Sequence, residues 1–184
     1  MIALAPTDYD WFKFLSAHPE LQEINFWTPT PWNIRQLNPG DHFYFLLKAP
    51  IRKIGGYGQF EYYENMSARA AWKRFGVGNG VGELDDFLGR VRRYAAHRSR
   101  DYVETEDPEI GCIVLQNPQF FQPDEYVAPQ EIGLSFPDTV VKHKYFDMES
   151  LFEESTSEHA TEVYWVTVGK GLGRNFDVGL EAGL

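Results

Sequence analysis

The chain has very little cysteine and no long hydrophobic run. Its single cysteine, Cys112, excludes an internal disulfide, and its place in the apolar run Ile110–Leu115 predicts a small buried side chain. No stretch of about 18 apolar residues is present, and the N-terminus lacks a basic region followed by an apolar one. These absences argue against a membrane span and a secretory signal, so we expect a cytoplasmic protein with no membrane partner.

Catalytic and metal-binding motifs are also missing. The sequence has no H-E-x-x-H, C-x-x-C or G-x-S-x-G pattern. Its five histidines show no metal-ligand spacing, and His143 with Asp147 is an isolated pair. The glycines between Gly76 and Gly82 do not form a phosphate loop, because no G-K-[ST] follows them. The sequence therefore predicts no catalytic residue, no metal and no cofactor, and it favours a binding protein over an enzyme.

Positive charge is scarce but concentrated. The chain has 17 Lys and Arg against 27 Asp and Glu, a net charge of −10. Eleven of these basic residues lie between Lys48 and Arg100 with only five acidic ones, so this basic segment carries +6 and the rest of the chain −16. A basic patch in an acidic protein favours a nucleic acid held at one defined face. The alternative explanation is a solvated helix face, which is typical of arginine runs.

Apolar spacing and capping signals predict three main helices. The first covers Thr7–Glu20 with Thr7 as its cap, and the second covers Ala68–Phe75 between a Ser67 cap and Gly76. The third, Glu83–Arg98, has one apolar stripe made of Leu84, Phe87, Leu88, Val91 and Ala95. Glycines 76–82 are expected to be a flexible connector, and Met148–Glu154 a short acidic helix.

Strands are expected between and after these helices. They are predicted at Phe43–Leu47, at Ile51–Glu64 with a break or close approach at Gly55-Gly56, at Ile110–Leu115 until Asn117-Pro118, at Val140–Phe146 as a strand or arm, and at Tyr164–Val168. The two prolines in 28–33 indicate a stiff loop. The order of elements predicts an α+β fold, with a curved, partly closed sheet and two adjacent helices inserted between strands.

Several short segments occur in an order that resembles a known family. They are Asn25-Phe26-Trp27, Pro39-Gly40-Asp41, Ile54-Gly55-Gly56, Ala71-Trp72 and Glu109-Ile110-Gly111-Cys112. This pattern resembles the sulfur-binding domain of phosphorothioate-dependent type IV restriction endonucleases of the McrA-like HNH group, over roughly residues 7–150. The strand features are also similar to the wider PUA-like superfamily, which includes SRA, EVE, ASCH and YTH readers.

The resemblance implies a module for host defence that binds double-stranded DNA carrying a non-bridging sulfur in its backbone. It implies a sulfur and phosphate site formed by Met66, Ser67, Ala70, Arg92 and Arg93. It also implies further DNA contacts from Arg90, Arg69, Lys73, Thr28, Pro29, Thr30 and Trp32. Thr28 occupies a position where relatives often carry an arginine, and Met66-Ser67 replaces a Tyr-Pro or Leu-Pro pair of some relatives.

Physical chemistry gives such a site a rationale. Ser67 begins a helix, and the free N–H groups of a helix N-terminus attract anions. Sulfur is larger and a weaker hydrogen-bond acceptor than oxygen, so an apolar dimple beside arginines would penalise oxygen more than sulfur. Arginine contacts to phosphates would supply affinity and salt dependence without sequence information.

The domain prediction follows from the same resemblance. Residues 1–168 are expected to form the sulfur-binding domain, and the glycine-rich tail 169–184 to begin a linker to an HNH nuclease domain in cis. A homodimer is a further expected partner.

Two other hypotheses stay open. One is a reader of methylated cytosine or adenine by base flipping. The other is an ASCH-like ligand-binding protein or small-molecule enzyme, with groups such as Glu61 and Lys48 or His42 converging in a cleft.

Overall fold

A six-stranded sheet with helices beside it organises the residues that the computed structural model describes, which are 1–31, 34–98, 103–134 and 144–146. The elements in chain order are β1 (Ile2–Thr7), α1 (Tyr9–Ser16), β2 (Glu23–Thr28), β3 (His42–Leu47), β4 (Ile54–Ser67), α2 (Ala68–Phe75), the 3₁₀ turn η1 (Gly76–Asn79), α3 (Leu84–Arg98), β5 (Glu109–Phe120), the 3₁₀ turns η2 (Pro123–Glu125) and η3 (Pro129–Ile132), and β6 (Lys144–Phe146).

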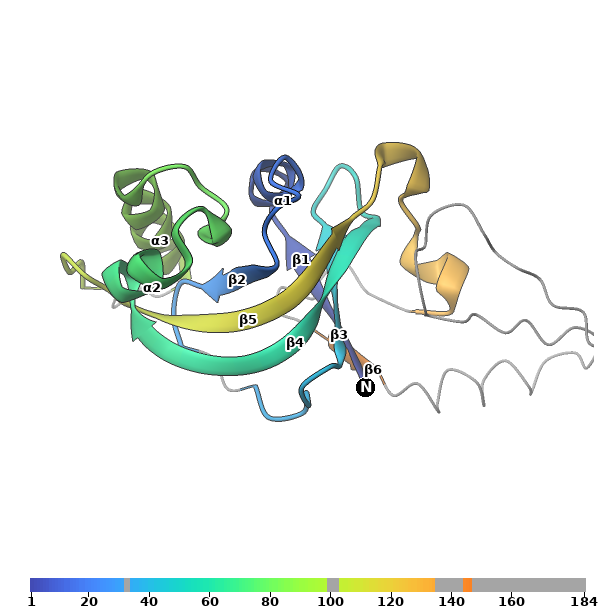
Figure 1. Ribbon diagram of the computed structural model, residues 1–184, viewed down its shortest axis with the longest axis horizontal. Helices are drawn as coiled ribbons and strands as arrows, with labels where there is room; N and C mark the ends of the chain where they lie inside the picture. Colours follow the sequence, from blue (N-terminus) through green and yellow to red (C-terminus); the bar gives the residue numbers. More distant parts are fainter. Residues whose placement is uncertain (32–33, 99–102, 135–143, 147–184) are drawn as a thin grey trace, which may run out of the picture.

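The strands lie in the order β2-β5-β4-β3-β1-β6. Only β1 and β3 pair in parallel, and the other neighbours are antiparallel. Figure 1 shows β4 and β5 as long curved strands, with α2 and α3 near one end of them. The predicted α+β fold with a curved sheet and inserted helices is confirmed, and in the described part the sheet stays open between its edge strands.

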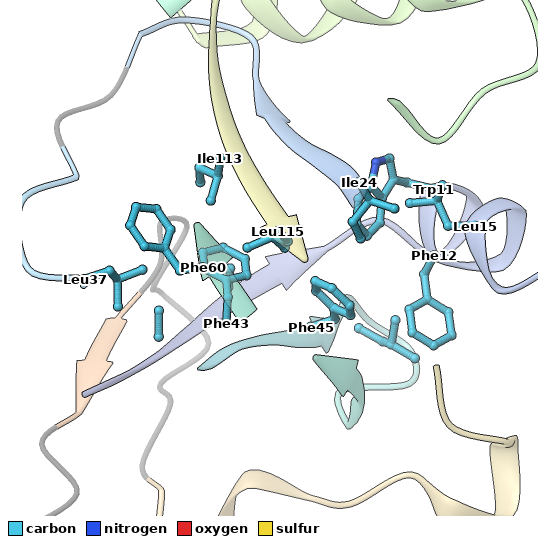
Figure 2. Packing of buried hydrophobic residues seen from close by; sticks show 13 residues of the cluster. Trp11, Phe12, Leu15, Ile24, Leu37, Phe43, Phe45, Phe60, Ile113 and Leu115 are labelled. Atoms are coloured by element: carbon cyan, nitrogen blue, oxygen red, sulfur yellow. The ribbon is translucent and has the colours of Figure 1, made fainter. Parts of the chain in front are cut away.

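Alternating side chains of β3 explain why both faces of the sheet are covered. Phe43, Phe45 and Leu47 point into one apolar cluster, while Tyr44 and Leu46 point into another. The first cluster also receives the buried residues of α1, namely Trp11, Phe12 and Leu15. Figure 2 shows these rings gathered between α1 and the sheet. This packing fixes α1 against the sheet, next to the end of β1.

The helices α2 and α3 form a third cluster on β5. The predicted α3 stripe is confirmed, because Phe87, Leu88, Val91 and Ala95 are buried and Leu84 packs half-buried against the same cluster. The boundaries of α2 are also confirmed, with Ser67 accepting a hydrogen bond from the Ala70 amide and Gly76 ending the helix at φ +51. Cys112 is buried in this cluster as predicted, and burial raises the pKa of its thiol to about 11.

The prediction of a helix from Thr7 is wrong at its start. Ile2–Thr7 is a strand, and the helix covers only Tyr9–Ser16. The Thr7 hydroxyl caps nothing and instead donates to the Ala5 carbonyl oxygen at 2.8 Å. Asp8 takes the N-cap position. The long-range pairing of β1 with β3 decides this conformation, which local spacing cannot reveal.

Two predicted strand breaks are also wrong. β4 continues through Gly55-Gly56, although the close approach expected there is real, because a Cβ on Gly56 would overlap the Gln119 carbonyl oxygen. β5 likewise continues through Asn117-Pro118. The register pairs Gln116 with Gln59 and Gln119 with Tyr57, so two residues of β5 face one of β4 in a bulge. A bulge accommodates a proline that a regular ladder would exclude.

The glycine-rich connector is ordered rather than flexible. Gly76–Asn79 forms a 3₁₀ turn, and the Asn79 side chain is fully buried beneath it. Gly80 follows at φ +80, where a Cβ would overlap the Trp11 ring, so only glycine fits.

Some predicted segments lie outside the described residues: the first part of Val140–Phe146, all of Met148–Glu154 and Tyr164–Val168, and the tail 169–184. Within the described part, no helix combines the length and the apolar character needed to cross a membrane.

Candidate functional site

A pocket lies where the ends of β1 and β2 meet α3 and the start of α1. Its volume is about 80 Å³. Its apolar lining consists of Ala5, Pro6, Trp11, Phe26, Trp27 and Pro29. Its polar lining consists of Thr7, Asp8, Thr28, Lys48, Arg90 and Tyr94. We call it the Lys48–Arg90 pocket, after its two cations.

Core packing holds the aromatic part of this pocket. The Trp11 ring packs edge-on against Phe26, with 5.3 Å between the ring centroids. Trp27 packs edge-on against Phe87 at 5.4 Å, and its Nε1 donates to the Asn79 carbonyl oxygen at 3.0 Å. Rings fixed by such contacts need little rearrangement on binding, which lowers the entropic cost of holding a ligand.

A small network of charged and polar groups stands at the mouth of the pocket. Lys48 Nζ lies 2.8 Å from Asp8 Oδ1 and 5.7 Å from the centroid of the Tyr94 ring. Burial, and after it the neighbouring Asp8 carboxylate, raises the pKa of Tyr94. The phenol therefore stays protonated at neutral pH and can donate to Asp8. With Arg90 from α3, the lining contains two cations and one carboxylate.

The backbone brings this network together from distant segments. The Lys48 amide donates to the Thr7 carbonyl oxygen at 3.0 Å, which ties the loop after β3 to the end of β1. Asp8 is the N-cap residue of α1, yet its side chain makes no capping hydrogen bond and is engaged with Lys48 instead. The positive end of the α1 dipole therefore borders the pocket without a side-chain cap.

The start of α2 differs from the anion site expected there. The Ala68 amide donates to the Pro108 carbonyl oxygen at 2.9 Å, and the Arg69 amide donates to the Asp107 carboxylate at 2.8 Å. The Ala70 amide donates to Ser67 Oγ at 3.2 Å. The prediction of free N–H groups at this helix start is wrong, because each of these three amides has a partner and one partner is negatively charged.

The other residues expected around sulfur lie near this helix start. Met66 is half-buried against the α2–α3 cluster, and Ala70 is exposed. Arg92 binds the Thr105 and Glu106 carbonyl oxygens, at 3.2 and 2.7 Å, so it anchors the segment before β5. Arg93 is exposed and lies over Tyr94.

The residues expected to contact DNA are divided between two places. Thr28, Pro29 and Arg90 line the Lys48–Arg90 pocket, whereas Arg69 and Lys73 are exposed on α2. The Thr28 hydroxyl is buried and donates to the Thr30 carbonyl oxygen at 2.8 Å. Trp32 lies outside the described residues.

The two places lie at the same end of the sheet. Gly111 of β5 pairs with Thr28 on one side and with Asn65 on the other. Asn65 precedes Met66-Ser67, so the β2 end and the α2 start are two strand spacings apart, about 10 Å.

The cleft expected for an ASCH-like protein, with Glu61 and Lys48 or His42 together, is not formed by these residues. Lys48 meets Asp8 and Tyr94 rather than Glu61 or His42. His42 begins β3 and Lys48 follows its end, which separates them by about 20 Å at the usual rise per strand residue. Sequence reasoning missed Asp8 and Tyr94, although Asp8 stands at a strand–helix junction and Tyr94 within the arginine run, where ligand-binding residues often occur.

No metal centre is evident among the described residues, where no three His, Cys, Asp or Glu side chains gather as a metal site would require.

Comparisons with known proteins inform the fold. No protein-family model matches the chain, and no curated protein matches it in sequence. Among solved structures, the crystal structure of ASCH from Zymomonas mobilis has 12% sequence identity and a TM-score of 0.54, over 85% of this chain and 94% of that one. A point mutant of the same protein gives the same identity and score, over 85% and 97%. At this identity the likeness shows the fold alone, and it confirms the predicted PUA-like architecture.

Proposed function

We propose that this chain is a PUA-like binding domain whose Lys48–Arg90 pocket holds a phosphate group of its ligand. The observation that carries this proposal is that two cations, 42 positions apart in sequence, line one pocket together with aromatic rings fixed by core packing. Both cations belong to the basic segment, so part of its positive charge would bind the phosphate group in an otherwise acidic protein. No bond is broken in this function, which is recognition.

The volume of the pocket limits what enters it. Pockets for drug-sized ligands measure about 300–1,000 Å³, against about 80 Å³ here. A water molecule needs about 10–15 Å³ measured in this way. The pocket therefore has room for a few waters, or for one phosphate group that replaces them. The rest of a larger ligand would extend past Tyr94 and Arg93 at the rim.

Phosphate binding is expected to depend on Lys48. Two charge-assisted hydrogen bonds of about 1.5–3 kcal/mol each suggest a dissociation constant on the order of 1 mM for a singly charged phosphate such as dimethyl phosphate. Lys48→Ala should weaken binding at least tenfold, because it removes a cation and leaves the Asp8 carboxylate without its partner. An NMR titration that follows the indole N–H signals of Trp11 and Trp27 measures this locally.

Lys13→Ala is the matched control, because Lys13 is exposed near the other end of α1 and the change in net charge is identical. The proposal would be wrong if dimethyl phosphate left both indole signals unmoved, or if Lys13→Ala weakened binding as much as Lys48→Ala.

A second candidate function is recognition of phosphorothioate DNA for restriction, as the family resemblance implies. It is supported by the ordered series of motifs from Asn25 to Cys112, and by the proximity of Thr28 to Met66-Ser67 across β5. The Asp107 carboxylate at the start of α2 weighs against a phosphate there. In this function the exposed Ala70 and half-buried Met66 would form the sulfur contact, and cleavage would belong to an HNH domain in cis.

Ala70→Glu should remove any preference for sulfur at the α2 start. The added carboxylate would fill the dimple and repel the DNA backbone. Fluorescence anisotropy with one short duplex, with and without a single phosphorothioate of defined stereochemistry, measures the preference at two salt concentrations. Equal binding of both duplexes by the unmodified chain would exclude this second function. A preference that survives Ala70→Glu would move the sulfur site away from α2.

A further inference from the structure

The Asp8 carboxylate is an unexpected neighbour for a phosphate group. It lines the Lys48–Arg90 pocket and lies 2.8 Å from Lys48 Nζ. Building on the proposed function, we propose that Asp8 restricts the pocket to singly charged phosphate groups, so that it accepts phosphodiesters and disfavours phosphomonoesters. Asp8 would then be the residue that determines which class of phosphate ligand is bound.

Charge balance carries this inference. Lys48, Arg90 and Asp8 together give the lining one net positive charge. A phosphodiester carries one negative charge and would leave the occupied site neutral. A phosphomonoester carries nearly two at pH 8, since its second pKa is about 6. Its second charge would be desolvated without a partner, which is unfavourable in a partly buried site.

Among the described residues that line the pocket, Lys48 and Arg90 are the two cations. Asp8 lies 2.8 Å from Lys48 of the loop after β3. Together with burial, the larger cause, it raises the pKa of Tyr94 on α3, and Arg90 of α3 lines the same pocket. Arg93, also on α3, lies over the Tyr94 ring, with 5.5 Å between its guanidinium carbon and the ring centroid. Arg93 does not line the pocket, unlike Lys48 and Arg90, so it is not counted in the charge of the lining. The Asp8 carboxylate thus neutralises part of the positive charge that a second negative charge on the ligand would need as its partner.

Methyl sulfate and methyl phosphate test the inference, because they have nearly the same shape and differ by one charge at pH 8. We expect methyl sulfate and dimethyl phosphate to bind with similar affinity, and methyl phosphate at least tenfold more weakly. The readout is the NMR titration of the Trp11 and Trp27 indole signals.

Asp8→Asn should remove the discrimination. The amide keeps the shape of the carboxylate and remains a good N-cap residue, so α1 should be preserved. The ratio of the methyl phosphate to the methyl sulfate dissociation constant should fall at least tenfold. Asp8→Ser, which also retains N-cap preference, serves as a second variant should the amide disturb the fold. Asp10→Asn is the control, because Asp10 is exposed in the first turn of α1 outside the pocket lining.

The outcomes separate the two proposals. If none of the three ions binds, the proposed phosphate function is wrong and this inference falls with it. If all three bind with equal affinity, or if Asp10→Asn changes the ratio as much as Asp8→Asn, the pocket is an anion site but Asp8 does not select charge.

Phosphodiesters occur both in cyclic nucleotides and in nucleic acid chains, and two further probes distinguish these sources. Adenosine 3′,5′-cyclic monophosphate and a dinucleoside monophosphate without a terminal phosphate each present one singly charged phosphate. Competition of either with dimethyl phosphate supports the inference and identifies the source. Failure of both would overturn it, because the pocket would then admit only small free ions.

Discussion

Arg90→Glu is expected to weaken phosphate binding at least a thousandfold. Arg90 lines the pocket from α3, and its replacement turns the net charge of the lining from one positive to one negative. Losing a hydrogen bond to a charged group costs about 1.5–3 kcal/mol. Placing a carboxylate about 5 Å from the phosphate adds about 3 kcal/mol of repulsion at an effective dielectric constant near 20. Together these effects exceed the roughly 4 kcal/mol that a thousandfold change requires.

The fold should survive this change. Arg90 lies outside the buried α3 stripe of Phe87, Leu88, Val91 and Ala95. Circular dichroism should therefore be unchanged, while the indole signals of Trp11 and Trp27 stop responding to phosphate.

Arg69→Glu is the control that also compares the two candidate sites. Arg69 is exposed on α2 and does not line the pocket, so Arg69→Glu should leave phosphate binding within about threefold, an effect that screening keeps small. The opposite pattern, with Arg69→Glu abolishing binding and Arg90→Glu harmless, would transfer the site to the start of α2.

The helices that local chemistry specifies could be predicted from the sequence. Ser67 and Gly76 mark the ends of α2 through a side-chain cap and a left-handed φ, both of which are local properties. The apolar residues of α3 repeat every three or four positions, and this spacing alone predicts a helix. β1 carries no such signal, because both of its faces are buried and the usual alternation of apolar and polar residues is absent.

Strand continuity was harder to predict because it depends on the partner strand. Pro118 would end a regular strand, but Gly58 alone stands opposite Asn117 and Pro118 in the bulge. Asn117 takes φ +48, a conformation that asparagine tolerates better than most residues. The sequence displays the proline and the asparagine, whereas the register that accommodates them exists only after β4 and β5 have paired.

The candidate site shows the same limit. The family resemblance implies that Arg90, Thr28 and Pro29 contact DNA, and the structure places these three residues in the lining of the Lys48–Arg90 pocket. Asp8 and Lys48, which line the same pocket, follow the ends of two strands and are 40 positions apart in sequence. A hydrogen bond from the Lys48 amide to the Thr7 carbonyl oxygen holds these two strand ends together. Local patterns cannot predict such a meeting. The basic segment predicts a binding face, but not that the Asp8 carboxylate lies beside Lys48.

Asn79→Ala is expected to destabilise the fold by about 3–5 kcal/mol. The fully buried Asn79 amide donates to the carbonyl oxygens of Gly76 at 2.8 Å and Ala71 at 3.2 Å, and its Oδ1 accepts from Asn25 Nδ2 at 2.9 Å. Alanine would leave these groups with fewer partners, and each unsatisfied buried group costs about 1–3 kcal/mol. Urea denaturation, with the slope unchanged, measures the loss as a lower midpoint.

Asn65→Ala is the matched control, because Asn65 is exposed and accepts one hydrogen bond, from the Tyr63 hydroxyl at 2.6 Å. It should cost less than about 1 kcal/mol, the typical net value of one hydrogen bond.

The Asn79 variant also tests how the pocket is supported. The Asn79 carbonyl oxygen accepts a hydrogen bond from Trp27 Nε1 at 3.0 Å, and Trp27 lines the Lys48–Arg90 pocket. If the buried amide positions this turn, folded Asn79→Ala protein should bind phosphate more weakly and show a shifted Trp27 indole signal before any ligand is added. A stability within about 1 kcal/mol of the parent, with an unshifted indole signal, would mean that the surrounding apolar packing alone fixes Trp27 and that the asparagine network is dispensable.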